Sequence, residues 1–251
     1  MRRKLLSLFF VFLLVLNSFS QVTPPPSISI SIRPAERPED LVATLEILLI
    51  LTVLALAPSI LVLFTSFTRI VVVFSFFRNA LGTRQTPPNQ VLIGLALFLT
   101  FLIMQPVWND IYNNAILPYT KREISYQEMF NRVNTRIRDF MIKELKNHHN
   151  EDNVFMLAKN SGINIQNVEE APNSVLIPAF VLGELEVAFK MGVVLYIPFI
   201  VIDMVVASIL LAMGMIMIPP VFISLPFKVL VFVLANGWDL MVEGLIKSFA
   251  R

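Results

Sequence analysis

The sequence predicts an all-α membrane protein: hydrophobic helical hairpins, with about four membrane-embedded helices, and a small helical insert on the periplasmic side. The first observation is composition, since hydrophobic residues make up 56% of the 251 residues and the mean hydropathy is +0.71. These values exceed those of an ordinary soluble domain. The second observation is distribution. Two long apolar regions flank residues 108–176, which hold 17 of the 38 Lys, Arg, Asp and Glu residues.

Charge and cysteine content exclude several classes of function. The formal net charge is +2, but three of the 20 basic residues lie at positions 2–4, in a segment predicted to be removed. The remaining 17 basic and 18 acidic residues carry no nucleic-acid signature. The chain has no cysteine, which excludes disulfides, thiolate metal sites and cysteine catalysis.

Residues 1–20 are predicted to be a secretory signal peptide. Basic residues at 2–4 precede the apolar run Leu5–Leu16, and a small-x-small pattern ends at Ser20 before Gln21. The run is too short to cross a hydrocarbon core of about 30 Å, although an uncleaved first anchor is the alternative. Residues 21–40 are rich in Pro and Ser and form a linker without a periodic apolar face.

Residues 41–107 are predicted to form the N-terminal hydrophobic helices. Pro58 interrupts the apolar run and is expected to kink or break the first helix. Arg78 and Arg84 flank a turn rich in Gly and Pro, so the positive-inside rule makes that turn cytoplasmic. The largely apolar helix Val91–Val107 then returns outward.

Residues 108–176 are predicted to form the water-exposed helical insert, which packs in an oligomer or on the membrane-embedded helices. Ser125 and Glu128 form a capping box that opens an amphipathic helix. A shorter helix follows at about Asp152–Lys159. One stripe of the first helix is apolar, comprising Met129, Phe130, Val133, Ile137, Phe140, Met141 and Leu145.

Two interpretations fit the segment His148–Asp152 of the insert: a metal site or a solvated loop. Adjacent histidines do not share a helix face, and the spacing matches no standard zinc site. The solvated loop is therefore the prediction, and no metal or other cofactor is expected.

Residues 177–251 are predicted to form the C-terminal hydrophobic helices, which carry unusual charges. Glu186 and Lys190 are four residues apart in the favourable order and form a pair within one helix. Glu184 lies about 200° around the helix from Glu186, so we expect its partner on a neighbouring chain. Arg69, in the N-terminal region, is either a snorkelling interface residue or an inter-subunit contact.

Asp203 and Lys228 form a second candidate pair, on either side of a methionine-rich segment. If the chain reverses within Met215–Met217, the two charges lie level and can pair in a low dielectric. If it reverses at Pro219 and Pro220, they differ by about 12 Å in depth. Methionine can be plain core filler, but the clustering with glycine and proline favours a re-entrant turn lining a passage. The residues concerned are Met213, Met215, Ile216 and Met217.

Two long segments resemble the FliP family, the P subunit of the bacterial flagellar type III protein export gate. They read LAPSILVLFTSFTRIVVVFSFFRNALGTRQTPPNQVLIGLALFLTFLIMQP and PAFVLGELEVAFKMGVVLYIPFIVIDMVVASILLAMGMIMIPPVFISLPFKVLVFVLANGWDL. The resemblance implies an inner-membrane, multi-pass subunit of the flagellar basal body. It implies a homo-oligomer that assembles with FliQ and FliR family subunits, and with other membrane proteins of the export gate. It also implies contact with membrane lipid and unfolded flagellar substrates in transit, while the charge balance predicts no nucleic-acid partner.

The resemblance also implies roles for individual residues. Met215, Ile216 and Met217 fall on the family's pore gasket, and Glu184, Asp203 and Lys228 on its charges for assembly or gating. Two positions depart from the family pattern. Ile216 stands where a third methionine is frequent, and Gly183 replaces a serine or threonine.

Three rival functions fit some features of the sequence. A virulence secretion subunit shares the fold, but the signal peptide and linker favour the flagellar branch. A small-ion or solute transporter fits the embedded charges, yet no paired inverted repeat of broken helices occurs in the sequence. An enzyme is disfavoured because both histidines lie in the insert, away from any embedded serine.

Overall fold

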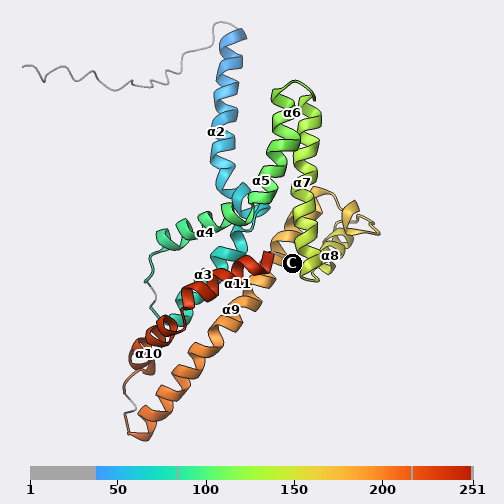
Figure 1. Ribbon diagram of the computed structural model, residues 1–251. Helices are drawn as coiled ribbons and strands as arrows, with labels where there is room; N and C mark the ends of the chain where they lie inside the picture. The colour runs from blue at the N-terminus through green and yellow to red at the C-terminus, as the bar shows by residue number, and fades with distance from the viewer. Residues whose placement is uncertain (1–37, 84, 216, 250–251) are drawn as a thin grey trace, which may run out of the picture. The chain divides into compact units, whose positions relative to one another are not determined.

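Helices account for every element that the structure, a computed structural model, describes in residues 38–83, 85–215 and 217–249 (Figure 1). This confirms the all-α prediction. The predicted cleavage site at Ser20 and Gln21 lies outside the described residues, as do Arg84 and Ile216. The signal peptide therefore stays a prediction.

The described residues fall into two units that meet after Thr52, within helix α2 (Pro38–Phe64). Pro58 was expected to kink or break the helix; it lies inside α2 and does not end it, so the break is wrong and the kink stays a prediction. A proline removes one N–H donor while keeping a helical φ, and a helix can absorb that loss. The helix ends instead at Phe64, beyond which the Thr68 hydroxyl donates to the Val62 carbonyl at 2.6 Å.

The core of the second unit is the packing of α3 (Phe67–Leu81) against the long helix α9 (Asn173–Ala212). Both helices are apolar, and α3 contributes fully buried Phe74 and Phe77. The two backbones approach closely at Gly192, where an added Cβ would stand 2.5 Å from the ring of Phe76. A side chain at this position therefore forces the two helices apart.

Two bent helix pairs complete the hydrophobic region. Helix α4 (Asn89–Ile103) is followed by α5 (Gln105–Ile111), so the predicted single helix is broken at Met104 with a bend of 54°. Helices α10 (Pro220–Leu234) and α11 (Gly237–Phe249) meet at 65°. Among the described residues two helices are long and apolar enough to cross a membrane, or up to four if each bent pair is one span.

The insert is helical, as predicted. It comprises the π-helix η1 (Tyr112–Ile116), α6 (Leu117–Thr120), α7 (Tyr126–Asn147), α8 (Asp152–Asn160) and the 3-10 turn η2 (Val168–Glu170). The Glu128 amide donates to the Ser125 hydroxyl at 3.2 Å, as the capping box requires. The Glu128 carboxylate, however, pairs with Arg132 at 2.9 Å. Both α7 and α8 pack on α9, so the insert rests on the hydrophobic helices.

Candidate functional site

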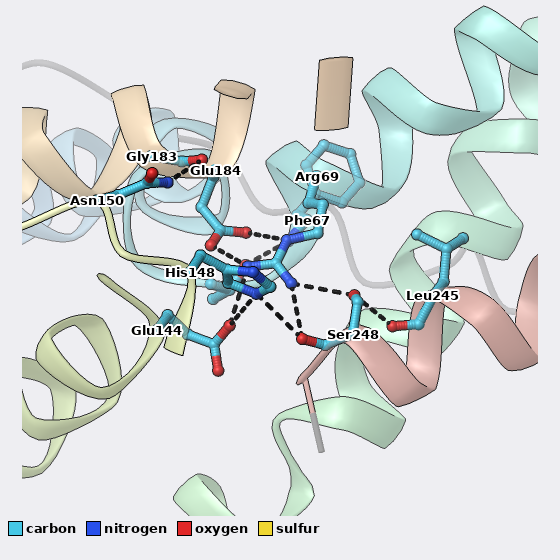
Figure 2. Close-up of polar contacts among 10 residues, drawn as sticks. Phe67, Arg69, Glu144, His148, Asn150, Gly183, Glu184, Leu245 and Ser248 are labelled. Carbon is cyan, nitrogen blue, oxygen red and sulfur yellow. Dashed lines mark hydrogen bonds and ion pairs between the residues drawn. The ribbon is translucent and has the colours of Figure 1, made fainter. Parts of the chain in front are cut away.

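Arg69 is the centre of a buried charge cluster. Its side chain is 0% exposed. Nε donates to Glu184 Oε2 at 2.9 Å and Nη2 to Glu184 Oε1 at 2.5 Å, which is a bidentate pair. Nη2 also donates to Glu144 Oε2 at 2.9 Å (Figure 2). A buried charge is tolerated only when its hydrogen bonds are made, and this guanidinium makes them.

The remaining Arg69 donor reaches the end of the chain. Nη1 donates to the Ser248 carbonyl at 3.1 Å and to its hydroxyl at 3.0 Å, and the guanidinium carbon lies 3.7 Å from the centre of the Phe249 ring. His148 Nε2 lies 3.1 Å from the same carbonyl and 3.7 Å from the Glu144 carboxylate. Helices α3, α7, α9 and α11 therefore meet at one guanidinium (Figure 2).

The cluster corrects two expectations. Glu184 was expected to find its partner on a neighbouring chain, but its partner is Arg69 of the same chain. Arg69 was expected either to snorkel at the membrane interface or to contact another subunit, yet it is fully buried within the chain. One sequence signal pointed to this arrangement. Glu144 lies on the apolar stripe of α7, between Met141 and Leu145 and with them buried, where an unpaired carboxylate is costly.

Glu144 is a carboxyl group of the cluster that lies in the insert. Burial raises its pKa from 4.5 to about 7, against the lowering effect of Arg69, and the neighbouring Glu184 carboxylate adds to the rise. Burial therefore favours the neutral form of the Glu144 carboxyl group, while Arg69 favours its charged form. With a pKa of about 7, the Glu144 carboxyl group is expected to gain or lose its proton near neutral pH.

The two adjacent histidines, His148 and His149, lie where helix α7 ends. His149 has a φ of 56°, and the amides of His149 and Asn150 donate to the Lys146 and Leu145 carbonyls, which is a Schellman motif. The prediction of a solvated loop is wrong for Asn150, which is 4% exposed and donates from Nδ2 to the Gly183 carbonyl at 3.2 Å. Within the described residues no group of three His, Cys, Asp or Glu side chains is placed to hold a metal ion.

The tight contact at Asn150 explains one departure from the family pattern. A Cβ added at Gly183 would lie 3.1 Å from Leu145 Cδ2 and 3.2 Å from Asn150 Nδ2. The glycine therefore lets the end of α7 lie directly on α9. A serine or threonine there requires the two side chains to give way.

Asp203 and Lys228 are brought together as the level geometry predicted. Lys228 Nζ donates to Asp203 Oδ2 at 2.6 Å and to the Ala80 carbonyl at 3.1 Å, and the Ser224 hydroxyl donates to Asp203 Oδ1 at 2.5 Å. Lys228 is 3% exposed. The contacts join α9 to α10, and α10 to the end of α3. Glu186 and Lys190 also pair as predicted, at 2.9 Å on an exposed face.

The methionine segment is the connection between α9 and α10. Gly214 has a φ of 75°, and the Gly214 and Met215 amides donate to the Leu211 and Leu210 carbonyls, so α9 ends in a Schellman motif. Pro219 precedes α10, which begins at Pro220, a favourable first helical position. The chain thus reverses within the methionine segment.

The methionines of this connection differ in exposure. Met213 is 57% exposed, Met217 is 93% exposed and Met215 is partly buried, while Ile216 lies outside the described residues. Apolar side chains of this size are normally covered, so Met213 and Met217 are available to another surface.

Comparisons with known proteins agree on one family. The model of the FliP family matches residues 50–245. The flagellar biosynthetic protein FliP of Aquifex aeolicus is 48% identical over 231 residues, which are 92% of this chain and 93% of that protein. FliP of Bacillus subtilis is 46% identical over 220 residues, which are 88% of this chain and 98% of that protein. A solved structure described as the periplasmic domain of FliP is 85% identical, covers 26% of this chain and 98% of its own, and has a TM-score of 0.26.

Proposed function

This chain belongs to the FliP family and is a flagellar biosynthetic protein of the export apparatus, and from that premise we propose that it is the pore-forming subunit of the membrane export gate. In this proposal several copies assemble in the inner membrane, at the flagellar basal body, with FliQ and FliR family subunits. Unfolded flagellar proteins pass through the central passage. The chain itself carries out no chemical reaction.

The observation that carries the proposal is the methionine connection between α9 and α10. It presents Met213 and Met217 to the outside at the end of two apolar helices. Apolar, deformable side chains from several copies close a passage to water and ions by packing and dewetting. The same side chains yield to an unfolded chain, because methionine changes rotamer at little cost.

The ion pair between α9 and α10, Asp203 with Lys228, supports the same role. Asp203, Ser224 and Lys228 fix the two arms of the hairpin against each other. The hairpin therefore holds the loop at a set depth, while the loop side chains remain free to rearrange. A seal of this kind needs a hairpin that is fixed in position and loop side chains that can change rotamer.

The proposal is tested by replacing Met215, Ile216 and Met217 together by Ala. The complex is expected to assemble, and cells are expected to leak small ions and dyes while still exporting a fraction of the flagellar proteins. Dye uptake and secreted flagellar protein are measured in the same cultures. A matched control replaces three exposed apolar residues of α9 away from the loop, Val193, Val201 and Val205.

The opposite pattern contradicts the proposal. If the triple variant stays tight while export of every substrate stops, the loop recognises or moves cargo and does not seal the passage. If the control variants leak equally, the leak comes from the hydrophobic helices in general.

A further inference from the structure

The C-terminal end of α11 is capped by side chains from other helices. The last four carbonyls of a helix have no partner within it, and the Ser248 carbonyl is one of these in α11. Arg69 Nη1 of α3 donates to this carbonyl at 3.1 Å, and His148 Nε2 at the end of α7 lies 3.1 Å from it (Figure 2). The Phe249 ring lies over the same guanidinium, 3.7 Å from its central carbon. Helix α11 therefore ends against a cation that belongs to the core of the chain.

The guanidinium that caps α11 also holds two carboxylates. Glu144 Oε2 accepts from Nη2 at 2.9 Å, and Glu184 accepts from Nε at 2.9 Å. When both carboxylates are charged, they outweigh the single positive charge of Arg69. The excess negative charge then lies beside the C-terminal end of α11, which is the negative end of its dipole. A proton on Glu144 removes this excess and the repulsion with it.

The charged and titratable groups that face Glu144 come from three helices. Arg69 belongs to α3 and Glu184 to α9, while Lys143 and His148, whose Nε2 lies 3.7 Å from Glu144 Oε2, belong to the α7 side. Helix α11 contributes Ser248 and Phe249, which are uncharged. Burial has the largest effect on the pKa of Glu144 and raises it to about 7; Glu184 adds to the rise, and Arg69 and Lys143 oppose it.

The end of α11 forms one wall between this cluster and the outside. Phe249 is 8% exposed and covers Arg69, and Glu144 is 2% exposed. A cavity of about 560 Å³ between α7 and α11 is lined by His148, Lys247 and Ser248, among others. Because Ser248 both lines the cavity and contacts Arg69, a movement of the end of α11 joins the cluster to the cavity and hydrates Glu144.

We propose that the Arg69 cluster is a proton-sensitive latch: a proton on Glu144 keeps the C-terminal end of α11 docked on the insert, and loss of that proton releases it. The latch is a property of the single chain, so it does not depend on the pore given under the proposed function. Its direction follows from linkage, because the docked form binds the proton more tightly than the released form, in which the carboxyl group is hydrated. Docking is therefore strongest at low pH and weakens as the pH rises through 7.

The latch is tested by hydrogen exchange of the full chain, purified from membranes in mild detergent. Exchange of peptides from α11 and from α3 is measured between pH 5 and pH 8, and each rate is divided by that of the same peptide unfolded at the same pH. We expect the end of α11 to open about tenfold more often at pH 8 than at pH 5. Helix α3, whose Phe74 and Phe77 are fully buried, is expected to stay protected throughout.

Three variants assign the proton to its residue. Glu144→Gln keeps an oxygen for Arg69 but cannot ionise, so the end of α11 is expected to stay docked at every pH. Glu169→Gln changes an exposed carboxylate of the same insert and is the matched control, expected to behave as the wild type. His148→Gln cannot become charged, and it is expected to keep most of the pH dependence because Glu144 is still present.

An α11 end that opens equally at all pH values in the wild type overturns the proposal. This series needs no substitution, so it decides the matter even if a variant does not fold. An unchanged pH dependence in Glu144→Gln, or its loss in His148→Gln alone, assigns the proton to another group and also overturns the proposal. Opening of α3 in parallel with α11 means that the whole protein unfolds, and then the cluster is not a latch.

Discussion

At the scale of single residues, Arg69 is the cation on which two carboxylates and the chain end depend. Removing it strands Glu144 and Glu184, both 2% exposed, at a cost of about 3–5 kcal/mol. Lysine cannot replace it, because a single ammonium does not reproduce the bidentate pair and the contact with Ser248. The triple change Arg69→Met, Glu144→Gln and Glu184→Gln removes all three charges together. It is therefore expected to be more stable than Arg69→Met alone, as measured by the thermal midpoints of the two purified proteins.

Glu144 is expected to make the folded protein less stable as the pH rises through 7. Its pKa in the folded protein, about 7, lies above the ordinary value of 4.5. Its contribution to stability is therefore fully present below about pH 4.5 and is lost as pH rises through 7. We expect the thermal midpoint of the purified protein to fall between pH 5 and pH 8, and Glu144→Gln to flatten that change.

Glu169 supplies the control for this measurement. Lys146 donates to its carboxylate and lowers its pKa, so any contribution has the opposite sign and is lost as pH falls below 4.5. The carboxylate is exposed and screened by solvent, so Glu169→Gln is expected to leave the slope between pH 5 and pH 8 unchanged. An unaltered slope in Glu144→Gln means that another group sets the pH dependence.

At the scale of elements, the α9–α10 hairpin is held by Asp203 and Lys228. Asp203→Ala leaves Lys228 buried with only the Ala80 carbonyl and the dipoles near it, at a cost of about 3–5 kcal/mol. We expect strongly reduced assembly or export, measured by recovery of the complex and by secreted flagellar protein. The swapped variant, Asp203→Lys with Lys228→Asp, is expected to recover only a fraction, because an aspartate at 228 faces the Ala80 carbonyl without a proton to donate.

The control for the swap is Glu186→Lys with Lys190→Glu, since that pair is exposed and contributes little. Equal loss in the single and swapped variants of Asp203 and Lys228, with the complex intact, means that the two charges have separate roles. Reduced assembly or export in the Glu186→Lys, Lys190→Glu control means that the order of the two charges along α9 is itself required.

The elements that the sequence predicted well are those whose signals are local. The start of α7 at Ser125, the end of α8 before Gly162 and the reversal at Gly214 all follow from nearby caps and turns. The partner of Glu184 did not follow, because Arg69 is 115 positions away in the sequence. Periodicity shows which face of a helix is apolar, but it does not show which helices are neighbours.

At the scale of the whole molecule, the processing of the N-terminus is a separate prediction. If residues 1–20 are removed as a signal peptide, the mature chain begins at Gln21, and N-terminal sequencing of the membrane-bound protein reads Gln21 onward. The control is a variant with Ser18 and Ser20 both changed to Leu, which removes the small residues that the peptidase requires. A membrane-bound wild type that keeps Met1 shows an uncleaved anchor instead.

The orientation of the insert relative to the turn after α3 is the last prediction. The chain has no cysteine, so a single introduced thiol reports one position. In the insert, Asn160 at the exposed end of α8 is a suitable site for the thiol. Gln85 is exposed in the turn after α3, which the positive-inside rule predicts to be cytoplasmic because Arg78 and Arg84 flank it. In intact spheroplasts an impermeant thiol reagent is expected to label Asn160→Cys and to leave Gln85→Cys unlabelled until the membrane is permeabilised. Labelling of Gln85→Cys alone reverses the topology, and labelling of both before permeabilisation means that the turn after α3 does not reach the cytoplasm.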